Sequence, residues 1–187
     1  MHVLCTVPEV YYYSYPYRIY YFLRIHLIFS EPYLLTMQFE TLFSEAFDTF
    51  KVFENLTVSI VAQKIPETPK TLWQILNHLI IWQENQLLLI TGNVPKKLIP
   101  EIEIWIEAEM PTDQHDIDNA VSTFNTQLHT IKTILSTLSL EQTDIELKLK
   151  KLQDMSNHLS FHLGEIILMR RQCKTYPMPE EMKLFLA

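Results

Sequence analysis

Two histidines four residues apart are the first residues in this chain whose spacing could support chemistry. They are His158 and His162 in the stretch "HLSFHLGEI". Residues four apart on a helix share one face, with side chains about 6 Å apart, so two neutral imidazoles can bind one metal ion. The alternative is that two polar residues happen to share a helix face.

A third histidine could complete such a site. His78 lies in "LWQILNHLIIW", one turn after Ile75, at the edge of an apolar stripe. Three neutral histidines leave coordination positions open for water or substrate, which is typical of catalytic zinc-type sites. Affinity for the metal is then expected to fall as the pH drops through the imidazole pKa near 6.5. The alternative interpretation makes His78 a hydrogen-bonded histidine at the edge of the core.

The two residues that follow His162 by two and three positions bear on the same site. Gly164 would cost a helix about 1 kcal/mol relative to alanine, which indicates close approach of another backbone or of a ligand. Glu165 lies one turn after His162 and is a candidate hydrogen-bond acceptor, a fourth ligand or a solvated side chain. Other metal patterns fail, because neither an HExxH helix nor a pair of Glu-x-x-His repeats is present. We expect the four remaining histidines to be surface residues: His2, His26, His115 and His129.

Helical periodicity predicts the elements that must position these side chains. Apolar residues recur at steps of three and four over residues 38–56, 71–91, 117–138 and 151–172. Only two glycines occur in 187 residues, which argues against an all-β fold. The predicted fold is therefore all-α, a four-helix bundle with a long loop between its second and third helices.

The segments between the predicted helices are less regular. Residues 93–115 and 144–150 both contain alternating apolar and charged residues, and we expect extended loops there. Gly92 is placed to end the second helix. The tail after Tyr176 is expected to form one short helix.

The chain divides at about Met37. Residues 1–36 are rich in tyrosine and broken by proline, and they are predicted to be an N-terminal extension outside the fold, with the bundle domain in residues 37–187. The alternative is an aromatic arm that binds a membrane surface or a partner. The apolar run 19–29 is too short to span a bilayer and lacks the features of a signal peptide.

Charge and cysteine content exclude some classes of function. The net charge is −7 and no cluster of Lys and Arg stands out, so nucleic-acid binding is not expected. No membrane association is expected for the bundle domain. The two cysteines, Cys5 and Cys173, make no disulfide framework, and a cytoplasmic location is expected.

The histidine motifs together resemble those of the DinB/YfiT-like superfamily of four-helix metalloproteins. "TLWQILNH" matches the family's second-helix pattern, and "HLSFHLGEIILMRR", followed by Pro177, matches its fourth-helix pattern. The resemblance covers residues 38–178. It implies a divalent metal, such as Zn, Ni, Mn or Fe, held by His78, His158 and His162, and a bundle that often forms homodimers. Relatives include thiol S-transferases that use low-molecular-weight thiols, and a thiol-dependent isomerase.

Two classes of function follow from these features. The first is a metal-dependent enzyme of the thiol S-transferase or hydrolase type, in which the metal lowers the pKa of a small thiol for attack on an electrophilic substrate, or activates water. The second is a non-catalytic, dimeric binding or stress-response bundle whose metal is structural or absent.

Overall fold

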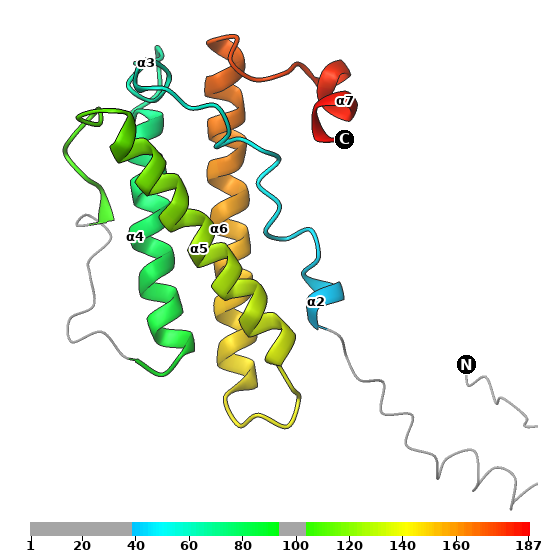
Figure 1. Ribbon diagram of the computed structural model, residues 1–187. Coiled ribbons are helices and arrows are strands. Elements are labelled where there is room, and N and C mark those ends of the chain that lie inside the picture. The colour runs from blue at the N-terminus through cyan, green and yellow to red at the C-terminus, as the bar shows by residue number, and fades with distance from the viewer. Residues whose placement is uncertain (1–38, 94–103) are drawn as a thin grey trace, which may run out of the picture. The chain divides into compact units, whose positions relative to one another are not determined.

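Three long helices dominate the computed structural model, which describes residues 39–93 and 104–187, all within one compact unit, Met37–Ala187. They are α4 (Leu72–Ile90), α5 (Gln114–Thr137) and α6 (Ile145–Gln172) (Figure 1). Four short helical elements accompany them: α2 (Phe39–Leu42), α3 (Val58–Val61), η2 (Pro179–Glu181) and α7 (Met182–Leu186). The described residues contain no strand, so the all-α prediction is confirmed.

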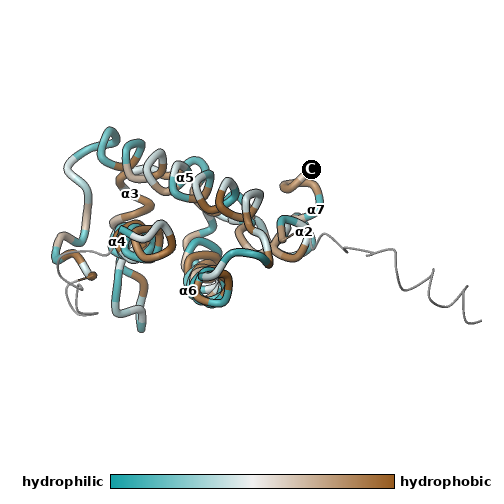
Figure 2. Tube along the Cα trace, turned by 90° about the horizontal axis from the view of Figure 1, so that it is seen from below, coloured by the Kyte–Doolittle hydropathy of each residue, from teal (hydrophilic) through white to brown (hydrophobic). Residues whose placement is uncertain are grey.

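The long helices form the core around α4. This helix packs against both α5 and α6, and Figure 2 shows α5 lying across the other two. Each long helix buries the apolar stripe that its periodicity predicts. The fully buried side chains at their meeting point include Ile75, Leu79, Phe124, Leu159 and Ile166.

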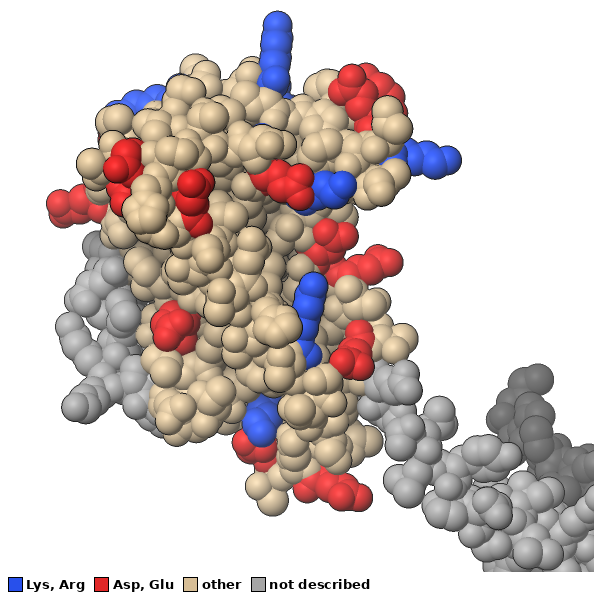
Figure 3. Space-filling model, viewed as in Figure 1, with Lys and Arg blue, Asp and Glu red and all other residues tan. Residues whose placement is uncertain are grey.

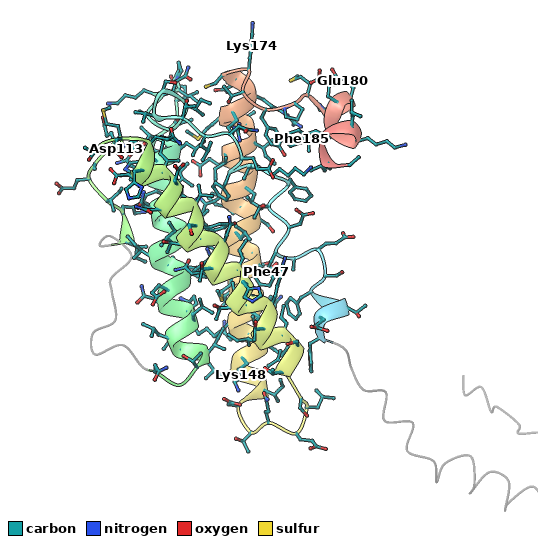
Figure 4. All side chains as sticks on the ribbon, viewed as in Figure 1. Phe47, Asp113, Lys148, Lys174, Glu180 and Phe185 are labelled. Atoms are coloured by element: carbon teal, nitrogen blue, oxygen red, sulfur yellow. The ribbon has the colours of Figure 1, made fainter. Side chains whose placement is uncertain are left out.

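Local sequence signals set the ends of the helices. The Thr71 side chain accepts from the Gln74 backbone while the Gln74 side chain accepts from the Thr71 backbone, a capping box that starts α4. Gly92 follows this helix with φ of +77°, a conformation that favours glycine, so its predicted capping role is confirmed. Asp113, labelled at the start of α5 in Figure 4, accepts a hydrogen bond from the Asp116 backbone and so caps this helix.

The long first helix predicted over residues 38–56 is wrong. The short helix α2 ends at Leu42, and a series of turns follows. Phe50, Lys51 and Asn55 have φ between 51° and 57°, which an α-helix cannot include. The apolar residues of the stripe still reach the core, because Phe47, Val52 and Phe53 are buried. Burial rather than helix formation therefore explains much of their spacing.

Side chains from the C-terminal part hold this irregular segment in place. Arg170 is buried and donates to the backbone carbonyls of Val52 and Glu54, and the Tyr176 hydroxyl donates to the carbonyl of Phe50. Carbonyls engaged in this way are satisfied by tertiary hydrogen bonds, so the segment needs no helical ladder. Periodicity alone cannot anticipate such distant donors.

The start of α6 also differs from the prediction. Residues 145–150, expected to be an extended loop, form the first turns of this helix. Ile145 and Leu149, four residues apart, pack against the core, whereas Leu147 between them is exposed. The alternating apolar and charged residues of 145–150 therefore belong to a helix, in which Ile145 and Leu149 share the buried face.

Predictions were also made for the segment before α5, the C-terminal tail and the N-terminal extension. Residues 105–113 contain bends without a helix or strand, as expected, whereas residues 114–115 already belong to α5, and residues 94–103 lie outside the described residues. The short C-terminal helix is confirmed by α7. The N-terminal extension 1–36 also lies outside the described residues, and its independence from the bundle domain stays a prediction.

Basic side chains do not form a cluster on the face of the described residues shown in Figure 3. On the face shown in Figure 3, the Lys and Arg side chains of the described residues are scattered singly, with acidic side chains between them. No helix in the described part of the chain is long and apolar enough to cross a membrane.

Candidate metal centre

The three predicted histidines meet between two helices. His78 projects from α4, and His158 and His162 project from α6, so the packing of these two helices assembles the cluster. One nitrogen from each ring lies within 4.8 Å of the others. His78 and His162 are buried, and His158 is half-buried at the edge of its stripe, as its helical position predicts.

Hydrogen bonds orient two pairs of groups in the cluster. The Nε2 atoms of His78 and His158 are 3.0 Å apart, so one of these rings donates to the other. Nδ1 of His162 lies 3.0 Å from Oε2 of Glu165. A carboxylate on Nδ1 leaves Nε2 of His162 free to face the other two rings. Of the alternatives for Glu165, the hydrogen-bond acceptor is the one that this geometry bears out.

Aromatic side chains wall the cluster. The indole of Trp105 stacks on His78 with ring centroids 3.8 Å apart and planes 7° apart. The indole of Trp82 stacks on His158 at 4.0 Å and 25°. Phe161 presents its ring to His162 at 5.0 Å, yet remains 70% exposed. The imidazoles therefore lie in a largely apolar setting.

Burial keeps two of the imidazoles neutral. Desolvation, followed by the nearby His162, lowers the pKa of His78 to about 4; the Ile104 backbone and Glu165 offset part of that change. Desolvation, then His162 and His78, lowers the pKa of His158 to about 3. Neutral imidazole is the form that binds metal. For His78 and His158, the lowered pKa values place competition between protons and metal below pH 6.5, and the expected loss of affinity near pH 6.5 stays a prediction for the site as a whole.

The spacing of one pair of donors, His78 and His158, suits a shared metal ion. Two nitrogens bound at 2.0–2.1 Å lie about 3.3 Å apart in tetrahedral geometry and about 2.9 Å apart at a right angle. The 3.0 Å between the Nε2 atoms of His78 and His158 falls within this range. Three buried or half-buried histidines could thus hold one metal ion.

Gly164 and the remaining histidines were also interpreted from the sequence. A Cβ on Gly164 would meet nothing within 4 Å, and this glycine is exposed, so the predicted close approach at Gly164 is wrong. His115 and His129 are exposed, as predicted, whereas His2 and His26 lie outside the described residues.

The two stacking tryptophans are the site residues that sequence reasoning missed. Trp82 follows His78 by four residues on α4, and that spacing could have suggested it. Trp105 belongs to a non-helical segment and carried no such signal.

No family model matches this chain, and neither a curated protein nor a solved structure matches it.

Proposed function

We propose that His78, His158 and His162 bind one divalent metal ion, such as Zn, Ni, Mn or Fe, and that the protein is a metal-dependent enzyme of the thiol S-transferase or hydrolase type. The observation that carries the proposal is the convergence of three imidazoles from α4 and α6 in an apolar setting. Depressed pKa values keep two of them neutral. Protonating either of two buried imidazoles in contact is costly, so both stay in the neutral form that binds metal.

The donor set favours an open coordination sphere. Three histidine ligands supply no charge, and Glu165 is engaged with Nδ1 of His162. A divalent metal held this way supplies Lewis acidity that lowers the pKa of a small thiol or of water.

The surrounding residues would prepare that chemistry. Glu165 orients His162, and the indoles of Trp82 and Trp105 keep water from the faces of the other two imidazoles. A low-molecular-weight thiol and a small electrophilic substrate are the proposed partners. Reducing conditions, as in the cytoplasm, would suit such a thiol.

The resemblance to the DinB/YfiT-like superfamily supports this assignment. We propose that the chain is a divergent member of this superfamily, in which the non-helical segment 43–56 stands in for the first bundle helix. Homodimer formation is part of the same proposal. Light scattering at micromolar concentration should give the mass of two chains, and a monomer mass would contradict it.

A second function is favoured by one specific contact. The hydrogen bond between the Nε2 atoms of His78 and His158 satisfies both atoms without a metal. This arrangement suits a non-catalytic binding or stress-response protein.

Thiol titration of cobalt-loaded protein separates the two candidates. If the enzyme proposal is correct, adding a low-molecular-weight thiol should produce a thiolate-to-cobalt charge-transfer band in the near ultraviolet. The variant His162→Ala should lack the band. Cobalt-loaded wild type that gives no band with small thiols, and shows no ionisation of a bound water, would contradict an enzyme.

A further inference from the structure

The three imidazoles of the cluster are oriented by different means. His162 is oriented by its hydrogen bond to Glu165. Nδ1 of His78 and Nδ1 of His158 are buried, and neither makes a hydrogen bond of normal geometry with the described residues. Histidine ligands of metals almost always donate from their second ring nitrogen, which fixes the plane of the ring. Apart from the Ile104 backbone beside His78, the planes of these two rings must be fixed by contacts other than hydrogen bonds.

Each of these two rings is stacked face to face on an indole. Trp105 covers His78 with nearly parallel planes, 3.8 Å between ring centroids, and Trp82 covers His158 at 4.0 Å. The indoles come from separate elements. Trp82 lies on α4 and reaches across to α6, whereas Trp105 follows the buried Ile104 in the segment before α5.

The indoles are themselves held in place. Lys70 lies just before α4, and its ammonium group is 5.2 Å from the Trp105 ring centroid. Trp105 therefore has contacts with both a cation and an imidazole, and cation–π attraction adds to its stacking. Trp82 is anchored by its helix.

We propose that Trp82 and Trp105 are positioning residues, which hold the planes of His158 and His78 by stacking so that both Nε2 atoms point at a shared metal. This inference rests on the proposed metal site. Rotation about the bond that joins an imidazole to its Cβ is only weakly restricted by the side chain itself. A flat aromatic face against the ring removes that freedom.

Coordination makes the stacking more important. The hydrogen bond between the two Nε2 atoms needs a proton on one of them. Both atoms must be unprotonated to bind a metal, so this hydrogen bond is lost on binding. The stacked indoles then stay in contact with both rings, alongside the Ile104 backbone at His78 and the His162 ring, which meets each imidazole edge-on.

Substitutions that separate ring stacking from volume test the proposal. Trp82 and Trp105 are each replaced by Phe, which keeps a flat ring, and by Met, which fills space without one. Trp73 is the remaining tryptophan of the chain and is buried on α4, so Trp73→Met is the matched control. The Zn²⁺ dissociation constant is measured by competition with a chromophoric chelator, and melting of the metal-free protein is measured separately.

We expect each Met variant at Trp82 or Trp105 to bind Zn²⁺ about 10-fold or more weakly, which is the range for loss of an orienting contact. Each Phe variant should bind within about 3-fold of wild type. Trp73→Met should lower the melting temperature with little change in the dissociation constant. Folded Met variants that bind Zn²⁺ as tightly as wild type would overturn the proposal. Wild type that binds no Zn²⁺ would overturn the metal site itself, and the two failures are thus distinguishable.

Tryptophan fluorescence gives a second readout. In variants that retain a single tryptophan, with Phe at the other two positions, stoichiometric Zn²⁺ should change the emission of Trp82 and of Trp105 but not that of Trp73. Unchanged emission from both Trp82 and Trp105 in protein that binds Zn²⁺ would contradict their role, even if a Met variant failed to fold.

Discussion

Lowering the pH should destabilise the metal-free protein through its buried histidines. In the folded protein the pKa is about 4 for His78 and about 3 for His158, against 6.5 for an unperturbed imidazole. As the pH falls, the unfolded chain therefore binds protons before the folded chain does. The contribution of each buried neutral imidazole to the free energy of unfolding is fully present above pH 6.5. It is lost as the pH falls from 6.5 to the pKa of that histidine in the folded protein.

The size of the effect follows from those values. Between pH 7 and pH 5, an unfolded histidine of pKa 6.5 gains about 2 kcal/mol from protonation, whereas a folded one of pKa 4 or below gains almost nothing. The free energy of unfolding should thus fall by about 2 kcal/mol for each of His78 and His158, and by about 4 kcal/mol for both.

Urea unfolding in the presence of a chelator measures this change. The variant His158→Gln stays neutral at every pH, so its loss of stability between pH 7 and pH 5 should be about 2 kcal/mol smaller than that of wild type. His129→Gln is the matched control, because His129 is exposed on α5 and its removal should leave the wild-type slope. A wild-type stability that is flat over this range, or a slope unchanged in His158→Gln, would refute the reasoning.

Three further predictions concern stability. Replacing Arg170 by Met leaves the buried carbonyls around it without a donor, so the free energy of unfolding measured by chemical denaturation should fall by about 3 kcal/mol. The control Lys150→Met, on the exposed face of α6, should lower it by less than about 0.5 kcal/mol. Equal losses in the two variants would contradict the structural role of Arg170. Gly164→Ala should raise the free energy of unfolding by about 1 kcal/mol, because alanine favours the helix and its Cβ meets no neighbour. Gly92→Ala should lower it by about 1 kcal/mol, because φ is +77° there. Changes of the opposite sign would contradict the roles given to these two glycines. Deleting residues 1–36 should leave helical content and melting temperature nearly unchanged, and a large loss of cooperativity would place the extension in the core.

The parts of the fold that depend on local sequence were predictable. Helical periodicity located α4, α5 and α6 from residue 151 onward, since an apolar face must be buried wherever it forms. Gly92 marked the end of α4, because glycine adopts a positive φ without steric cost whatever its tertiary surroundings. The juxtaposition of His78 with the His158 and His162 pair needed only the packing of α4 on α6.

Features that depend on distant partners were not predictable. Residues 43–56 repeat apolar side chains like a helix, but Arg170, more than 100 residues away, satisfies carbonyls that a helix would use itself. Trp105 reaches His78 from a segment without periodicity. Gly164 suggested a close approach that is absent, because an exposed helix position tolerates glycine at modest cost without any packing reason.

Elemental analysis of four proteins tests the central claim most directly. Wild type and the single variants His78→Ala, His158→Ala and His162→Ala are purified, stripped with chelator, reloaded with one divalent metal and dialysed. The metal site predicts one metal per wild-type chain and substoichiometric metal in every variant. It also predicts a greater loss of thermal stability in metal-free His162→Ala than in metal-free His158→Ala, because His162 is the more deeply buried of the two. Stoichiometric metal in all three variants, or none in wild type, would contradict the account.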